Sequence, residues 1–135
     1  MTNYRDIFGN MDTIQAISTP FGRTLTISDG VFTISVSDTD FGDRKVEVKS
    51  TGVVGIRSWD NAIDYDLVLP DDTVVEVDHI EQFMPVYRKA GPELRMELMA
   101  AYDAATRAKM LYQCWEDITD DPDFQFLFQP ADVAA

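Results

Sequence analysis

Four carboxylates on one expected β-hairpin are the residues of this chain best placed to do chemistry. Apolar and polar residues alternate over 65–69 and again over 73–77, which predicts two antiparallel strands joined by a three-residue loop. The register that gathers the apolar side chains on one face sets carboxylates opposite one another on the other face. The opposed pairs are Asp66 with Glu76 and Asp64 with Asp78.

Such a ladder of like charges needs an explanation. Directly opposed like charges destabilise a sheet, and carboxylates two positions apart on one strand lie about 6.8 Å apart. One interpretation is a well-solvated face with Arg57 or Lys45 nearby. The others are a cation site and a docking surface for a basic partner.

Other patterns for metal binding or catalysis are poor. Residues 38–43 begin like a calcium loop, but Gly and Asp are transposed and Lys49 stands where a bidentate Glu belongs. Acidic neighbours disfavour a reactive thiolate at Cys114, and His79 continues a strand pattern as a structural histidine would. We therefore expect no catalytic residue, no metal site and no cofactor.

The C-terminal tail combines carboxylates with aromatic rings. Phe124, Phe126 and Phe128 recur at strand spacing, which predicts a last strand added to the sheet. The functional alternative is mimicry of single-stranded nucleic acid, in which carboxylates replace phosphates and rings replace stacked bases in a partner's groove. The candidate contacts in the tail are Asp120, Asp121, Asp123, Phe124 and Phe126.

A long helix is expected over residues 91–118, since Gly-Pro-Glu is typical of a helix start. At 100° per residue, one side carries the apolar stripe Leu94, Leu98, Ala101, Ala105, Ala108, Tyr112 and Trp115. The opposite side carries Met96, Met99 and Met110. Flexible thioethers suit adaptable contact surfaces, so this methionine face is either a homodimer interface or is covered by the N-terminal segment or the tail.

These elements predict one α+β domain over residues 1–135. We expect a helical segment over 1–20, because apolar residues recur there every three or four positions, and a β-rich core over 21–88 with a hairpin turn at Asp29-Gly30. The helix over 91–118 and an acidic-aromatic tail over 119–135 complete the chain. The fold class is a small, curled antiparallel sheet packed by one long C-terminal helix, with a short N-terminal helix.

Composition restricts the classes of partner. The 135 residues hold 24 acidic and 11 basic side chains, for a net charge of -13, which disfavours direct binding to nucleic acid or an anionic membrane. Cys114 is the only cysteine, so an internal disulfide is excluded and a reducing compartment is favoured. No stretch is long and apolar enough to cross a bilayer, and we expect a cytoplasmic protein, in the host cytoplasm if it is viral.

Residues 51–86 resemble the core of SH3-like small barrels. The segment Thr51-Gly52-Val53-Val54-Gly55-Ile56 precedes a strand from Tyr65 to Leu69, an acidic turn, and an apolar run that ends at Pro85. The resemblance implies a curled barrel that serves as a binding or assembly module. It assigns no functional residue to this chain.

The distribution of charge favours an interaction protein. Residues 1–50 hold seven acidic and five basic residues, 51–90 hold eight and three, and 91–135 hold nine and three. The sequence therefore predicts a non-enzymatic acidic protein that covers a basic, nucleic-acid-binding surface of a partner protein, as a DNA mimic or a viral anti-defence inhibitor does. The alternatives are a small SH3-like assembly module, in homodimeric form, and a divalent-cation-dependent hydrolase.

Overall fold

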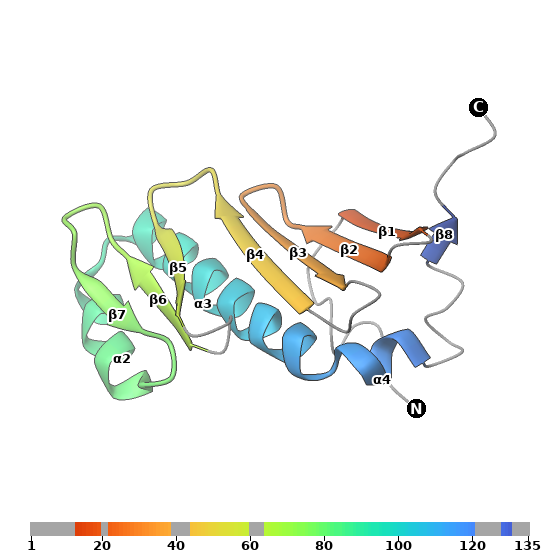
Figure 1. Ribbon diagram of the computed structural model, residues 1–135. Coiled ribbons are helices and arrows are strands. Elements are labelled where there is room, and N and C mark those ends of the chain that lie inside the picture. The colour runs from red at the N-terminus through yellow and green to blue at the C-terminus, as the bar shows by residue number, and fades with distance from the viewer. Residues whose placement is uncertain (1–12, 20–21, 39–43, 60–63, 121–127, 131–135) are drawn as a thin grey trace.

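The computed structural model describes residues 13–19, 22–38, 44–59, 64–120 and 128–130 (Figure 1). Its strands are β1 (Thr13–Thr19), β2 (Gly22–Ser28), β3 (Phe32–Asp38), β4 (Arg44–Ser50), β5 (Gly55–Trp59), β6 (Asp64–Val68), β7 (Val74–Glu76) and β8 (Phe128–Pro130). Its helices are α2 (Ile80–Lys89), α3 (Pro92–Gln113) and α4 (Trp115–Asp120). The protein is α+β, as the sequence predicts.

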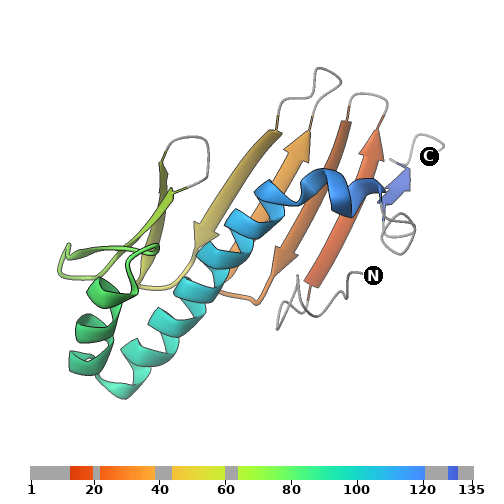
Figure 2. The same ribbon diagram turned by 90° about the horizontal axis from the view of Figure 1, so that it is seen from below.

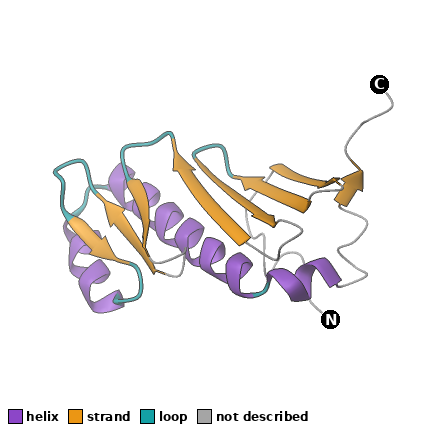
Figure 3. Cartoon of the chain, in the orientation of Figure 1, coloured by secondary structure: helices purple, strands orange, loops and turns teal. Residues whose placement is uncertain are grey.

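Two sheets form one layer and the helices form the other (Figure 3). The larger sheet has the order β4-β3-β2-β1-β8; its first four strands are antiparallel, and β8 joins β1 in parallel. The smaller sheet has the order β5-β6-β7 and is antiparallel. Helix α3 runs across one face of both sheets, and α2 lies beside it under β7 (Figures 1 and 2).

Apolar and polar residues alternate along β2 and β3 of the larger sheet, which gives the sheet one apolar face. Leu25 and Ile27 of β2 pair with Val36 and Ile34 of β3, and all four side chains are buried against the helix layer. The residues between them are Ser or Thr, and their hydroxyls bond across the strands, as between Thr26 Oγ1 and Ser35 Oγ at 3.3 Å. This period of two places the apolar side chains on one face only.

Helix α3 carries the apolar stripe that its sequence predicts. Leu98, Ala101, Ala105 and Ala108 are buried, and Leu94 and Tyr112 are half-buried. Ala104 and Leu111 extend the stripe. Because alanine side chains are small, the axis of α3 can lie close to the strands, and the core between them is thin. In the described part of the chain, no helix is long and apolar enough to span a membrane.

The predicted helix over 91–118 is divided near its end. Helix α3 ends at Gln113 and α4 begins at Trp115, with Cys114 at φ -102° and ψ 13° between them. The backbone bonds continue across the break, since Cys114 N donates to Met110 O at 2.8 Å and Ile118 N donates to Cys114 O at 2.9 Å. The change of direction brings Trp115 and Ile118 into the core.

Two expectations about local structure are wrong. The predicted N-terminal helix is replaced over Thr13–Thr19 by β1, because seven residues of this segment pair with β2 and bury Ala16; residues 1–12 lie outside the described part. The predicted β-rich core also contains a helix, α2. Pro85 lies inside α2, which the buried Phe83 holds against Tyr102 with ring centroids 4.8 Å apart.

The strands of the described residues form two open sheets and no closed barrel. The SH3-like expectation for residues 51–86 is therefore not confirmed. Within that segment, β5, β6 and β7 are followed by α2 rather than by further strands of a barrel.

Candidate functional site

The acidic hairpin adopts the predicted register. Leu67 pairs with Val75 and Asp66 with Glu76, and Leu69 N donates to Thr73 O at 2.8 Å. Strand β7 stops at Glu76, although Val77 N still donates to Tyr65 O at 3.0 Å in the predicted register. Asp64 pairs instead with Trp59 of β5.

Side chains of Arg57, Lys109 and His79 contact three of the four predicted carboxylates. Arg57 Nη2 lies 3.2 Å from Asp66 Oδ2, and the Asp66 side chain is only 7% exposed. Lys109 Nζ lies 2.9 Å from Asp78, and His79 lies 3.1 Å from Glu76. Burial removes Asp66 from surface contact, whereas Glu76 and Asp78 keep exposed oxygen atoms. Within the described residues, no group of three or more His, Cys, Asp or Glu is placed to hold a metal ion.

The tail contributes one strand to the described structure. Phe128 begins β8, which lies parallel to β1, and Asp120 ends α4. The predicted last strand is therefore present over Phe128–Pro130. The other tail candidates, Asp121, Asp123, Phe124 and Phe126, lie outside the described residues.

The methionine face divides into an exposed part and a packed part. The Met96 side chain is 76% exposed and Met99 is 48% exposed, although both are large and apolar. Met110 packs against the core instead. Helix α3 therefore presents two methionines to solvent in its first half only.

An open groove of about 390 Å³ adjoins Met96. It lies between the first half of α3 and the turn that joins β2 to β3, and it is lined by Val31, Phe32, Glu93, Met96, Glu97 and Ala100. The β2–β3 turn and the β4–β5 connection both approach this half of α3 (Figures 1 and 2). We call this site the α3 groove.

The β2–β3 turn fixes one wall of the α3 groove. Asp29 Oδ1 accepts hydrogen bonds from Val31 N at 2.9 Å and from Phe32 N at 2.7 Å. Gly30 has φ +96°, a conformation that glycine adopts without strain. The turn buries Phe32 completely and leaves Val31 partly exposed at the rim, so the predicted Asp29-Gly30 turn is confirmed and positions the wall.

Glu97 fixes the other wall by linking α3 to the β4–β5 connection. Its Oε2 accepts a hydrogen bond from Val54 N. Gly52 permits this contact, because a Cβ at that position would lie 2.3 Å from Glu97 Oε1. The connection is tied to the turn as well, since Thr51 N donates to Val31 O at 3.0 Å.

The α3 groove is acidic and apolar. Among the described residues, Glu93 and Glu97 are its charged lining residues, and no described Lys or Arg lines it. The nearby Arg95 is directed toward α2, where Nε donates to Tyr87 O at 3.1 Å and the guanidinium lies over the Tyr87 ring. The site therefore offers an apolar floor with a negative rim.

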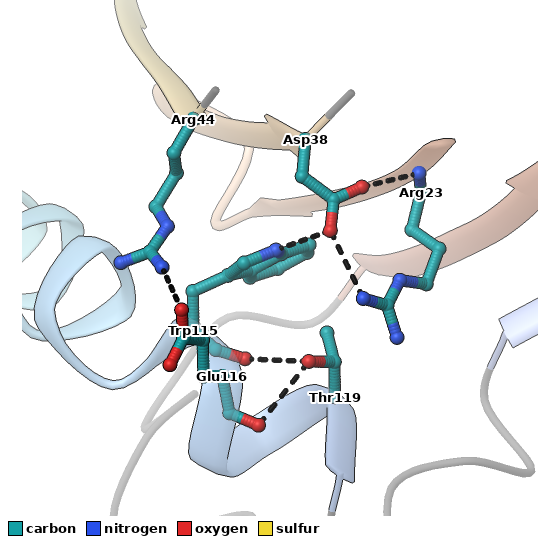
Figure 4. Close-up of polar contacts among 6 residues, drawn as sticks. All are labelled: Arg23, Asp38, Arg44, Trp115, Glu116 and Thr119. Carbon is teal, nitrogen blue, oxygen red and sulfur yellow. Dashed lines mark hydrogen bonds and ion pairs between the residues drawn. The ribbon is translucent and has the colours of Figure 1, made fainter. Parts of the chain in front are cut away.

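A second polar cluster holds α4 against the larger sheet (Figure 4). Asp38 accepts hydrogen bonds from Arg23 N at 2.6 Å, from Arg23 Nη2 at 3.1 Å and from Trp115 Nε1 at 2.9 Å. Burial alone would raise the pKa of Asp38, but the Trp115 and Arg23 hydrogen bonds and the Arg23 charge outweigh it and lower that pKa. Arg44 lies over the Tyr112 ring and contacts Glu116 at 3.4 Å.

Sequence patterns identify Met96 of the α3 groove but not its neighbours. Val31 follows an evident turn, and Glu93 and Glu97 lie one helical turn apart on either side of Met96. That spacing signals a shared helix face. Nothing in the sequence places the turn beside that face.

No protein-family model, curated protein or solved structure matches this chain. The proposals below therefore rest on the sequence and the geometry alone.

Proposed function

We propose that the chain is a non-enzymatic acidic protein that binds a basic, nucleic-acid-binding surface of a partner protein. The observation that carries the proposal is the uncompensated charge of -13 on 135 residues, together with the internal use of the cations. Inhibitors that mimic DNA, including viral ones, act through such a charge distribution.

The described basic side chains are largely committed to internal contacts. Arg23, Arg57 and Arg107 form ion pairs with Asp38, Asp66 and Asp103 at 3.1, 3.2 and 2.8 Å. Ion pairs also engage Arg44, Lys45 and Lys109. Each of these cations neutralises the carboxylate that it contacts. The remaining carboxylates therefore determine the electrostatic potential around the protein, which is negative.

A negative potential mainly increases the rate at which a basic partner associates. Complementary charge accelerates encounter, and salt screens this effect over about 8 Å at physiological ionic strength. Carboxylates at Glu93, Glu97 and Asp117 are candidate contacts, because none of them has an ion pair among the described contacts. Of the predicted contacts, Glu76, Asp78 and Asp120 stay in the proposal, while the buried Asp66 does not.

Affinity capture tests the proposed function. The immobilised chain is exposed at low salt to lysate of the cells that contain it, then eluted with duplex and with single-stranded DNA. We expect one basic nucleic-acid-binding protein to be released by DNA. Captured proteins that DNA does not release would contradict the proposal.

A homodimeric assembly module is the second candidate, favoured by the exposure of Met96 and Met99. Sedimentation of the wild-type chain at micromolar concentration distinguishes it. A dimer that Met99→Glu converts to a folded monomer would support this candidate. A wild-type monomer would exclude it.

A further inference from the structure

The α3 groove combines exposed apolar side chains, a negative rim and a wall whose backbone groups are already bonded. From these three properties we infer that it is a docking site for a short amphipathic helix of the partner, apolar on one side and rich in Lys or Arg on the other. This inference rests on the proposed function and adds where and in what form the partner binds.

Exposed apolar side chains lie at and beside the α3 groove, although Ile14, Val74 and Ile80 are exposed elsewhere. Met96 and Val31 line it with 76% and 37% of their surface exposed, and Val53, which is 63% exposed, precedes the Val54 amide that Glu97 binds. Single exposed apolar residues are ordinary, but clustered ones mark contact surfaces. Thioether side chains adapt to different apolar partners. The floor therefore suits apolar side chains of a partner.

The negative charge of the rim favours a basic occupant over an acidic one. A second copy of this chain would bring its own Glu93 and Glu97, and a further net charge of -13, toward the same carboxylates. Anionic ligands are disfavoured for the same reason. An occupant with Lys or Arg beside its apolar residues gains complementary charge instead.

The bonded backbone of the wall favours a helix over an added strand. Val31 N and Phe32 N are both bonded to Asp29, and Val31 O accepts from Thr51. Val54 N is bonded to Glu97. An extended peptide would find none of these groups free for strand pairing, whereas a helix satisfies its own backbone groups and presents only side chains.

The shape of the site agrees with a protein side chain as occupant. A volume of about 390 Å³ is at the low end of the range for small-molecule pockets. Met96 stays largely exposed beside it, so the site is open rather than enclosing. It would accept a few apolar side chains of one helix face.

The direct test uses a synthetic amphipathic peptide as the probe, about 18 residues long, which gives roughly five helical turns. Leucines occupy one helical face and lysines the other. The control is a scrambled peptide with the same composition. Amide shifts of the ¹⁵N-labelled chain should change at Val31, Phe32, Met96 and Ala100, and the scrambled peptide should bind about tenfold more weakly.

Matched variants separate the α3 groove from general charge attraction. Met96→Glu should weaken peptide binding by about tenfold or more, since it replaces an apolar contact of the groove with a charge. Met99→Glu, on the same helix but outside the lining, should leave binding within about twofold of the wild type. Glu93→Lys should weaken binding about tenfold at low salt, and Asp117→Lys, the same charge change on α4, by about twofold. Circular dichroism verifies that each variant is folded.

Three results would overturn the inference: equal binding of the scrambled peptide, equal effects of Met96→Glu and Met99→Glu, or amide shifts confined to another surface. Salt-sensitive binding of the peptide elsewhere would refute the docking site and leave the proposed function intact. The proposed function fails separately, if DNA releases no captured protein.

Discussion

Asp38→Asn is the substitution that tests the attachment of α4 most sharply, because it replaces one acceptor oxygen in a part-buried hydrogen-bond network. Asp38 Oδ1 accepts from Arg23 N, and Oδ2 accepts from both Arg23 Nη2 and Trp115 Nε1. An asparagine has one acceptor oxygen, so in either orientation its NH₂ group faces a donor. The favoured orientation places the amide oxygen at the Oδ2 position, where it keeps the bonds from Arg23 Nη2 and Trp115 Nε1 and loses the one from Arg23 N.

The expected cost follows from the number of bonds lost. A hydrogen bond to a charged group contributes roughly 1.5–3 kcal/mol, and a buried donor without a partner costs roughly 1–3 kcal/mol. The two bonds that remain, from Arg23 Nη2 and Trp115 Nε1, lose the negative charge of their acceptor and become weaker. We expect Asp38→Asn to lower the free energy of unfolding by about 3 kcal/mol and the Tm by about 10 °C.

The same residue gives the loss a defined pH dependence. The pKa of Asp38 is lowered from its ordinary value of 3.8 in the folded protein. Its contribution to stability is therefore complete above that ordinary value and is lost as pH falls through the lower, folded-state pKa. The stability difference between wild type and Asp38→Asn should shrink below about pH 4.

Urea unfolding at pH 7 and at pH 3, followed by tryptophan fluorescence, measures both effects. Glu116→Gln is the matched control in the same cluster, since the Glu116 side chain is 84% exposed and its contact with Arg44 is long; exposed ion pairs contribute about 0–1 kcal/mol. If Asp38→Asn changed stability at pH 7 by less than about 0.5 kcal/mol, the described attachment of α4 would be refuted.

Three further substitutions test the core and the walls of the α3 groove. Gly52→Ala should displace Glu97 from Val54 N and destabilise the chain by about 1–2 kcal/mol in urea, with much less effect in a Glu97→Ala background. Tyr65→Phe should unfold at equal or higher urea, because the buried hydroxyl has no hydrogen-bond partner among the described residues; burial raises the pKa of Tyr65 to about 12, so one tyrosine should resist ionisation at pH 11 in an absorbance titration. Ala105→Leu should cost about 1–3 kcal/mol by overpacking, measured as a fall in Tm, since Ala105 is fully buried.

Local patterns predict those parts of this fold that depend on neighbouring residues. The Asp29-Gly30 turn, the register of Asp66 with Glu76 and the buried stripe of α3 all follow from alternation, turn chemistry or helical spacing. Each of these signals lies within a short segment, where the period of apolar residues decides which face is buried.

Where local patterns predict the wrong secondary structure, contacts between distant residues determine it. Residues 13–19 carry apolar residues at helical spacing, yet pairing with β2 makes them a strand. Pro85 argues against a helix, yet Phe83 is buried and packs against Tyr102 of α3, which stabilises α2 around the proline. In both segments a contact between distant residues outweighs a weak local preference.

In the candidate site, too, local spacing predicts some residues, whereas others depend on tertiary contacts. Helical spacing predicts that Met96, Met99 and Met110 are not needed for the core, and Met96 and Met99 are indeed exposed. Met110 packs against the core instead. The wall formed by Val31 cannot be predicted, since it depends on how the turn approaches α3. The internal ion pair of Asp66 with Arg57 likewise depends on the pairing of β5 with β6.

Competition for one surface is the most direct test of the central claim. The partner obtained by capture is purified, saturated with a fluorescently labelled DNA duplex, and titrated with this chain while anisotropy is recorded. We expect the chain to displace the duplex completely at one-to-one stoichiometry, less readily as salt increases, with no species that contains all three components. A stable ternary complex of partner, DNA and this chain would contradict it.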